Sequence, residues 1–379
     1  NNSDDSLRRF DRSGPATARE CGGSGFSGNF MNWATSSAID VLRLGLTGGD
    51  RIKDEENLTI LQRAVIRKSF FNSSGNFPAK NLPANLANGA VPNALKGTFT
   101  GDIKIANCLN RIHFGTTSVA RSNTFVGGLE TVGCDAPGNN SNLGVAGGAN
   151  GTTALTSNNF FYTRVQVCEP TDPRTVDGFC IKQPSGKYKP LGNLQKYSDR
   201  VRIAAFGYLK DDTLARYGGV LRAPMKFLGP NTYDQSGALQ AGVNPNVEWD
   251  VITGVFKTNP EGAAEGISGV VNYLNQFGRT SATSQGEYKT YDPVGELYYE
   301  ALRYIQGLQP TPQAVSNITA TMKDGFPVYS TWADPHAGGS TTSNYSCLKN
   351  NIVVVGDKNT HADKSLPGNS NTSSSDFSR

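Results

Sequence analysis

The chain has 379 residues, more than a single hydrophobic core usually serves, so we expect either two domains or one large domain with insertions. Its 36 Lys and Arg residues against 32 Asp and Glu give a net charge of +4. The sequence has no long basic run, so we do not expect it to bind nucleic acid. No apolar stretch reaches transmembrane length and no signal peptide begins at Asn1, so an exported protein is expected to have lost its beginning.

Six cysteines without a CxxC pair indicate disulfides rather than a zinc site. Cys168 and Cys180 bracket a short, turn-rich segment, so we predict that they pair with each other. Spacing leaves the partners of the other four open: Cys21, Cys108, Cys134 and Cys347. Disulfides indicate an oxidising compartment such as a periplasm or a cell surface, with reduced buried cysteines as the alternative.

The beginning of the chain has the periodicity of helices. Residues 1–28 are polar and glycine-rich and are expected to be irregular. Apolar residues at helical spacing then predict a buried helix over 29–46, and Gly48 is suited to end it. A second helix is predicted over 58–70, because Asn57 can cap it and an apolar stripe follows.

The middle of the chain has short β-branched and aromatic stretches separated by turn residues, a pattern typical of strands. We predict a β-rich insertion over 97–260, with a long surface loop at 127–158 and one helical turn at 193–200. The expected strands lie at 98–105, 111–115, 160–168, 200–209, 218–229 and 248–257.

The end of the chain returns to helices and then to a strand. Spacing predicts helices over 267–277 and 293–308, the second with Asp292 as its cap and Pro293 in its first turn. Residues 352–355, Ile-Val-Val-Val, are typical of a parallel strand buried on both faces. The expected fold is an α/β core interrupted by an insertion. Its predicted divisions are 1–96 and 261–363 for the two parts of the core, 97–260 for the insertion and 364–379 for a linker tail.

Polar residues follow the predicted strand at 352–355. Ligands bind beyond the carboxyl ends of parallel strands, so chemistry or metal binding is expected at Asp357, with Asn359, His361 and Asp363 close behind it. A carboxylate there could hold Mg²⁺ or Ca²⁺ while a partner's carboxylate completes the shell, which needs no acid/base residue. The alternatives are a solvated loop after a core strand and a metallohydrolase built from the same residues.

Catalysis has few candidates in this sequence. There is no GxSxG or HExxH motif, and no cysteine lies in a Cys/His context. His113 lies in a strand-like stretch and His336 in a turn, positions where a histidine is more often structural or exposed than catalytic. We therefore expect a binding protein rather than an enzyme.

Several blocks of the sequence resemble one protein family, in the order in which they occur. Residues 27–51, SGNFMNWATSSAIDVLRLGLTGGDR, resemble the signature of the type IV pilus tip-associated proteins of the PilY1/PilC family. Further blocks similar to that family follow at 206–227, 267–277, 288–304 and 347–368. The likeness therefore runs over nearly the whole chain.

The resemblance implies a von Willebrand factor A-like, Rossmann-type core and a calcium-binding β-propeller beyond the end of this chain. It also implies a pilus-tip adhesin and assembly factor that acts with minor pilins in attachment, twitching motility and surface sensing, and that meets a host or surface receptor. Such a protein is exported through the periplasm to the cell surface and does not span the membrane. Asp357 is similar to the aspartate of a metal-ion-dependent adhesion site.

The sequence departs from that pattern in two places. The DxSxS motif of such a metal site is absent, and Thr290–Pro293 stands where its threonine loop is expected. Either a preceding piece is missing or the metal shell is incomplete, so a purely architectural tip subunit with a vestigial metal site is the alternative. Phe160, Phe161 and Tyr162 are candidates for docking a partner, with packing in the insertion's own core as the alternative.

Overall fold

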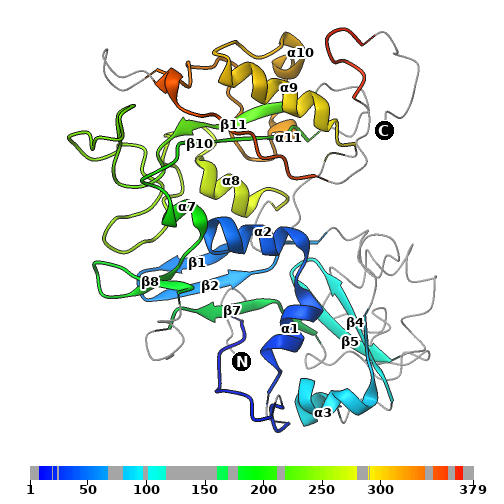
Figure 1. The fold of residues 1–379 in the computed structure, drawn as a ribbon. Coiled ribbons are helices and arrows are strands. Elements are labelled where there is room, and N and C mark those ends of the chain that lie inside the picture. Colours follow the sequence, from blue (N-terminus) through cyan, green and yellow to red (C-terminus); the bar gives the residue numbers. More distant parts are fainter. Residues whose placement is uncertain are drawn as a thin grey trace. The chain divides into compact units, whose positions relative to one another are not determined.

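The structure is a computed structural model in which two compact units are distinguished, each described here by itself (Figure 1). The first unit comprises Asn1–Leu44, Gly49–Asp172 and Ser281–Gln285, and the second comprises Gly45–Gly48, Pro173–Thr280 and Gly286–Arg379. The structure describes residues 8–18, 20–23, 25–66, 80–96, 101–116, 160–169, 178–210, 218–279, 289, 291–337, 345–356 and 363–369.

Two helices replace the single helix predicted over 29–46. Helix α1 (Gly28–Thr35) is capped by Ser27, whose hydroxyl accepts a hydrogen bond from the N–H of Phe30. Helix α2 (Ala38–Thr47) begins after a break at Ser36 and Ser37. The carboxylate of Asp40 accepts hydrogen bonds from both the N–H and the hydroxyl of Ser37. Serine competes with the helical backbone for hydrogen bonds, so the pair of serines starts a second helix.

The first sheet corrects the helix predicted over 58–70. Its antiparallel order is β1-β2-β7, and residue 55 of β1 pairs with residue 58 of β2 across a two-residue turn at Glu56 and Asn57. Asn57 is therefore a turn residue and not a helix cap. The strands are β1 (Arg51–Glu55), β2 (Leu58–Gln62) and β7 (Arg164–Val167). Residues 67–70 lie outside the described part of the chain.

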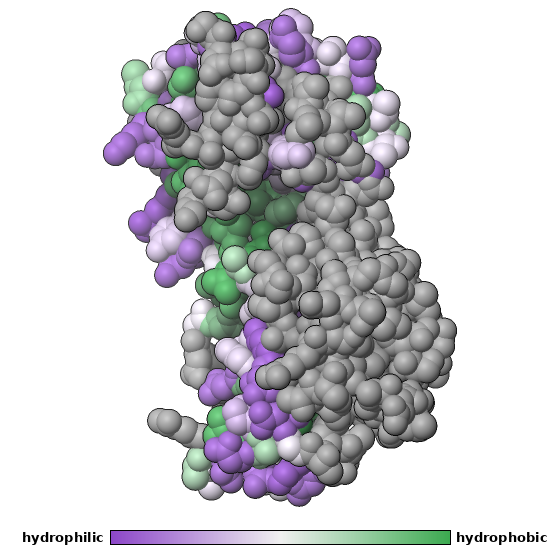
Figure 2. Space-filling model, turned by 90° about the vertical axis from the view of Figure 1, so that its right-hand side faces the viewer, coloured by the Kyte–Doolittle hydropathy of each residue, from purple (hydrophilic) through white to green (hydrophobic). Residues whose placement is uncertain are grey.

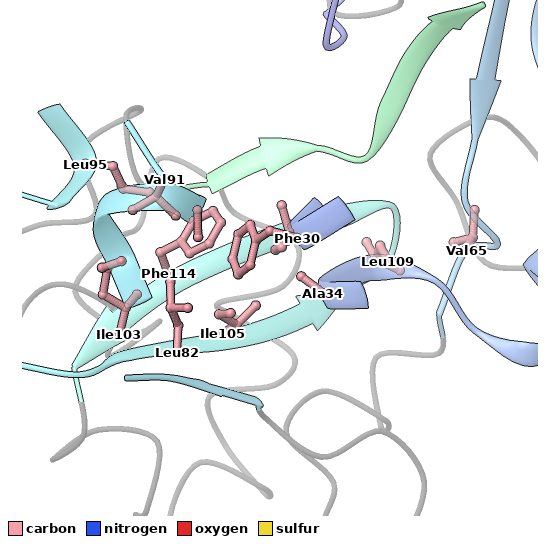
Figure 3. Packing of buried hydrophobic residues seen from close by; sticks show 13 residues of the cluster. Phe30, Ala34, Val65, Leu82, Val91, Leu95, Ile103, Ile105, Leu109 and Phe114 are labelled. Atoms are coloured by element: carbon pink, nitrogen blue, oxygen red, sulfur yellow. The ribbon is translucent and has the colours of Figure 1, made fainter. Parts of the chain in front are cut away.

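The second sheet of this unit confirms strands in the predicted insertion. Its antiparallel order is β3-β4-β5-β6. Apolar side chains from α1 and from this sheet form the core in Figure 3, where Phe30 lies near Phe114 and Ala34 near Ile105. The elements are β3 (Lys80–Leu82), η3 (Ala84–Leu86), α3 (Ala87–Ala90), α4 (Asn93–Lys96), β4 (Ile103–Cys108), β5 (Arg111–Thr116) and β6 (Phe160–Tyr162).

Phe161 belongs to this core. Its ring lies 5.0 Å from that of Phe26 and 5.9 Å from that of Phe114, measured between centroids. The Arg164 guanidinium lies 4.7 Å from the centre of the Tyr162 ring. Packing within the unit, the alternative to docking, therefore holds for Phe161.

The second unit contains two small antiparallel sheets of two strands each, together with the predicted helices. Helix α9 (Val294–Ile305) lies against β11, where Gly219 leaves space for Leu297 because a side chain at that position would overlap it. The helical turn predicted at 193–200 and the helices predicted at 267–277 and 293–308 are confirmed. The elements are β8 (Cys180–Lys182), β9 (Tyr188–Pro190), α7 (Asn193–Lys196), β10 (Ile203–Tyr208), β11 (Gly219–Lys226), α8 (Val270–Gln276), α9, α10 (Pro312–Val315), α11 (Ala320–Lys323) and η8 (Tyr345–Cys347).

An irregular stretch between β11 and α8 is ordered by side chains that bond to the backbone. The strand predicted at 248–257 is wrong, because Asp250 accepts hydrogen bonds from the N–H groups of Ile252 and Thr253 and turns the chain there. Glu248 is buried, and its carboxylate accepts from the N–H groups of Val270 and Val271 at the start of α8. Local polar bonds thus replace a sheet ladder in this stretch.

The described residues form a mixed α/β structure with small antiparallel sheets, which bears out the α/β class. A single parallel bridge, Phe10 with Val165, occurs among them. The larger parallel sheet expected from the buried strand at 352–355 is not formed by these residues. Nowhere in the described ranges does a helix have the length and apolar character needed to cross a membrane.

Candidate functional site at the start of helix α9

The polar residues predicted to form a metal site divide between two parts of the chain. Asp357 and His361 lie outside the described residues. Asp363 is described and is 7% exposed. The strand expected to precede them is not a buried strand, since the side chains of Val353, Val354 and Val355 are 85%, 45% and 65% exposed. No described strand pairs with this segment.

Asp363 caps helix α9. Its two carboxylate oxygens accept hydrogen bonds from the N–H of Gly295 at 3.0 Å and from the N–H of Glu296 at 2.9 Å. These N–H groups lie in the first turn of a helix, where no intrahelical acceptor exists and the helix dipole favours a negative charge. Gly295 allows this approach, since a Cβ there would lie 3.1 Å from a carboxylate oxygen. A residue predicted as a metal ligand or a loop residue thus holds a helix end.

The side chain of Glu296 binds two segments outside the helix. Its carboxylate accepts hydrogen bonds from the N–H of Ser365 at 2.9 Å and from the N–H of Gly218 at 2.7 Å. Its side chain is 1% exposed. The two acids therefore form a reciprocal arrangement, which we name the α9 clamp and which consists of Asp363, Glu296 and these four backbone N–H groups. The clamp joins three segments that are far apart in sequence.

Two groups at the clamp, Glu296 and Tyr208, have raised pKa values, which favours their neutral forms. Burial, with a smaller contribution from Asp363, raises the pKa of Glu296 above its ordinary value despite the hydrogen bonds from the backbone. Burial and the nearby carboxylates of Asp292, Asp363 and Glu296 raise the pKa of Tyr208. The Tyr208 hydroxyl is buried and makes no hydrogen bond within the described part of the chain.

The same helix holds further segments along its length. The buried carboxylate of Glu300 accepts hydrogen bonds from the N–H of Thr311 at 3.1 Å and from its hydroxyl at 2.7 Å. Near the helix C-terminus, Nε2 of His336 lies 2.7 Å from the carbonyl oxygen of Ile305. His336 therefore has the structural role expected of it. His113 lies in β5.

An aromatic group near the C-terminus of α9 completes its environment, with Tyr304 one turn after Glu300 on the same side of the helix. The rings of Phe206, Tyr304 and Trp332 meet edge to face, with centroids 5.4 to 5.7 Å apart. Tyr304 and Trp332 are 2% and 4% exposed. Such edge-to-face pairs stabilise a fold beyond the area that they bury. Helix α9 is thus fixed by apolar packing as well as by its two acids.

The clamp is not arranged as a metal site. Among the described residues, no group of three or more His, Cys, Asp or Glu side chains is placed to hold an ion. Both carboxylate oxygens of Asp363 accept hydrogen bonds from backbone N–H groups of the helix. Oxygens of this kind are the ligands that a hard cation would need. A metal at Asp357 stays a prediction. Cys168 and Cys180 are both disulfide-bonded, so the predicted disulfide chemistry is present.

Sequence reasoning missed Glu296 and Glu300 as key residues. Their spacing of four places them on one side of the helix, and this pattern usually marks a solvated face. The available signal was the position of Glu296 in the first helical turn after Pro293, where an acid is favoured. Nothing in the sequence showed that both acids point inward.

Comparisons with known proteins match most of the chain. Residues 3–111 match the family model described as "PilY1 homolog, small alpha/beta domain", and residues 213–379 match "PilY1 homolog, second domain". A protein of Xylella fastidiosa strain Temecula1, named "Type IV pilus biogenesis factor PilY1 homolog", is 35% identical over 370 residues, which cover 92% of this chain and 28% of that protein. A second protein of the same name and strain is 25% identical over 392 residues, covering 93% of this chain and 24% of its own.

The chain thus spans about a quarter of the length of the curated relatives it matches. No solved structure matches it. The two family models fall on different parts of the chain, at its beginning and at its end, and together they cover most of it. Both name the same family as the relatives do. The chain belongs to the PilY1 family of type IV pilus proteins.

Proposed function

We propose that this chain is a binding region of a type IV pilus biogenesis factor and acts as an adhesin and assembly factor at the pilus tip. The observation that carries the proposal is the 35% identity, over 92% of the chain, to a protein named as such a factor. Its partners in this proposal are minor pilins during assembly and a host or surface receptor afterwards. The role is one of binding rather than catalysis, and the protein is exported through the periplasm to the cell surface.

The disulfide-bonded Cys168 and Cys180 support an exported location, because such bonds persist in oxidising compartments. Twitching motility and surface sensing are part of the proposal, since both depend on assembled pili. A von Willebrand factor A-like core stays a prediction from the resemblance in sequence.

A purely architectural tip subunit is the second candidate. It is favoured by Asp363, whose carboxylate holds a helix end instead of presenting its oxygens for an ion. In this version the polar segment after residue 356 has a structural role, and any metal site is vestigial. Substitution of Asp357 separates the two candidates, since attachment depends on that side chain only in the first.

The experiment that tests the pilus role removes residues 1–379 from the full-length protein in its native host. We expect loss of surface pili by electron microscopy and loss of attachment and twitching, with recovery on complementation by the intact gene. As a control for export, the amount of shortened protein in the periplasm and on the cell surface is measured by immunoblotting. Normal piliation and attachment with the shortened protein would sink the proposal.

A further inference from the structure

One cation of the second unit is held in place by an aromatic ring and has no paired anion. Hydrophobic side chains reach the surface in several places, as Figure 2 shows for one face of the molecule. Apolar area alone does not specify a ligand, whereas an oriented cation specifies both the charge and the geometry of one. Arg202 is such a cation, and it is a partly exposed residue directly before β10.

The guanidinium of Arg202 makes few polar contacts for a side chain that is partly buried. Its Nη2 donates a hydrogen bond to the carbonyl oxygen of Met225 at 3.5 Å. Among the residues that the structure describes, no carboxylate lies at ion-pair distance from it. Burial lowers the pKa of Arg202, and the opposing effects of Tyr345, Tyr304 and Asp334 are smaller. The fold thus removes water from a cation without supplying the anion that would compensate it.

The ring of Tyr345 holds this guanidinium in place. The Cζ of Arg202 lies 4.0 Å from the centre of the ring, within the range of a cation–π contact. Tyr345 is 7% exposed, its N–H donates to the carbonyl of His336 at 2.8 Å, and its hydroxyl donates to the carbonyl of Tyr233. Its ring also lies 6.3 Å from that of Phe227, measured between centroids. The cation is therefore oriented before a ligand arrives, which lowers the entropic cost of binding.

A second arginine of the same unit shows what a structural role looks like. Arg303 of α9 is also partly exposed, and its guanidinium lies 5.7 Å from the centre of the Tyr299 ring. Its Nε donates to the carbonyl oxygen of Gln309 at 3.0 Å, and its Nη1 donates to the hydroxyl of Tyr299 at 3.4 Å. Arg303 uses both sides of its guanidinium within the fold. Arg202 has N–H groups left over for a ligand.

The charges near Arg202 specify the kind of anion. A guanidinium presents parallel N–H groups that match the two oxygens of a carboxylate. Asp334 adds negative charge nearby, so a singly charged carboxylate fits better than a dianionic phosphate. The exposed side chains just before the site, Lys196, Asp199 and Arg200, have a net positive charge. This excess favours a partner segment with more than one acid.

We propose that Arg202 binds the side-chain carboxylate of an acidic segment in a protein partner. The guanidinium forms a bidentate contact with that carboxylate while Tyr345 supports it from one face. This inference rests on the binding role proposed above and deepens it, because it names a recognition residue and the chemistry of the partner.

The test selects a displayed library of short random peptides on the purified full-length protein, with the Arg202→Gln protein as counter-selection. We expect peptides retained only by wild type to be enriched in Asp and Glu over the starting library. For the best of them, fluorescence anisotropy should show a Kd that rises about tenfold or more with Arg202→Gln. Replacing the critical Glu of the peptide by Gln should have the same effect. Both changes together should add little, because they remove the same contact.

The matched control is Arg303→Gln, which should leave the Kd unchanged because its partners lie within the fold. Arg202→Lys keeps the charge without the planar fork, so its Kd should lie between those of wild type and Arg202→Gln. Arg202→Gln should melt like wild type, since a single long hydrogen bond is lost; if it unfolds, Arg202→Lys decides the test.

Four results would overturn the proposal. They are selected peptides without an excess of acids, an equal loss of binding with Arg303→Gln, tighter binding when phosphoserine replaces the critical Glu, and pairing of two copies of the protein that depends on Arg202. None of these measurements reads piliation. Failure of the carboxylate site is therefore distinguishable from failure of the pilus role.

Discussion

Replacing Asp363 by alanine tests the assignment of this residue to the α9 clamp. The change removes a buried carboxylate that accepts two backbone N–H groups in the first turn of α9. Hydrogen bonds to charged groups contribute about 1.5–3 kcal/mol each, and loss of a helix cap costs about 0.5–2 kcal/mol. The two energies describe the same hydrogen bonds in part and are not added in full, and water can bind the released N–H groups. We therefore expect Asp363→Ala to lower the free energy of unfolding by about 2–4 kcal/mol.

The assay is urea unfolding of the purified chain, with hydrogen exchange measured on peptides from α9. Exchange identifies where stability is lost, which a single melting curve for two units does not. We expect faster exchange in Val294–Ile305 than in wild type. Asp363→Asn keeps one acceptor oxygen without the charge, and its effect should lie between those of wild type and Asp363→Ala.

The matched control is Asp234→Ala. Asp234 also accepts hydrogen bonds from two backbone N–H groups, those of Ser236 and Ala238, but its carboxylate is exposed to water. The number of backbone bonds lost is the same, and Asp234→Ala also removes the hydrogen bond from the Ser236 hydroxyl, so a larger effect of Asp363→Ala is due to burial and the helix end. A change in stability for Asp363→Ala no larger than that for Asp234→Ala would refute the reasoning.

Three further predictions concern a titrating acid, a buried aromatic residue and a metal. Burial raises the pKa of Asp324 from 3.8 to about 6, so the folded state binds the extra proton between these values and the acid costs stability as pH rises through them. Asp324→Asn removes this cost, so the variant should gain stability over wild type at pH 7 but not at pH 4. Because the group is partly exposed, we expect the difference between the two pH values to be about 1 kcal/mol in the free energy of unfolding. An equal effect at both pH values in urea titrations would contradict this. Trp332→Ala should cost about 3–5 kcal/mol in the same assay, with the half-exposed Trp33→Ala as a control that costs much less. Calorimetric titration with Mg²⁺ and Ca²⁺ should show binding heat that Asp357→Ala abolishes; absence of heat in wild type would remove the metal site.

Local sequence signals predicted the elements that carry their own start and stop residues. Pro293 and a regular apolar stripe located α9, and Gly278 marked the end of α8. The strands β10 and β11 were located by their β-branched and aromatic residues. In each case the local preference and the surrounding packing favour the same structure, so the prediction needs no knowledge of distant contacts.

Elements that depend on distant partners were predicted less well. Asn57 can cap a helix or form a turn. It forms a turn because the residues after it, in β2, pair with β7, a strand about a hundred residues further along the chain. The run at 352–355 has the composition of a buried strand, but burial requires neighbours, which the described residues do not supply. The role of Asp363 depends on a helix that begins almost seventy residues earlier.

Helix α9 also determines where the protein can be shortened. Its buried acids hold backbone groups of Gly218, Thr311 and Ser365, so segments before and after the helix contribute to keeping it folded. A shortened version ending after η8 (Tyr345–Cys347) would retain every described helix and strand of the second unit, yet it would remove Asp363 and leave two N–H groups of α9 without their acceptor. Trimming for crystallisation or for partner screening should therefore keep residues through at least Asn369, although the last described element of regular structure ends more than twenty residues earlier.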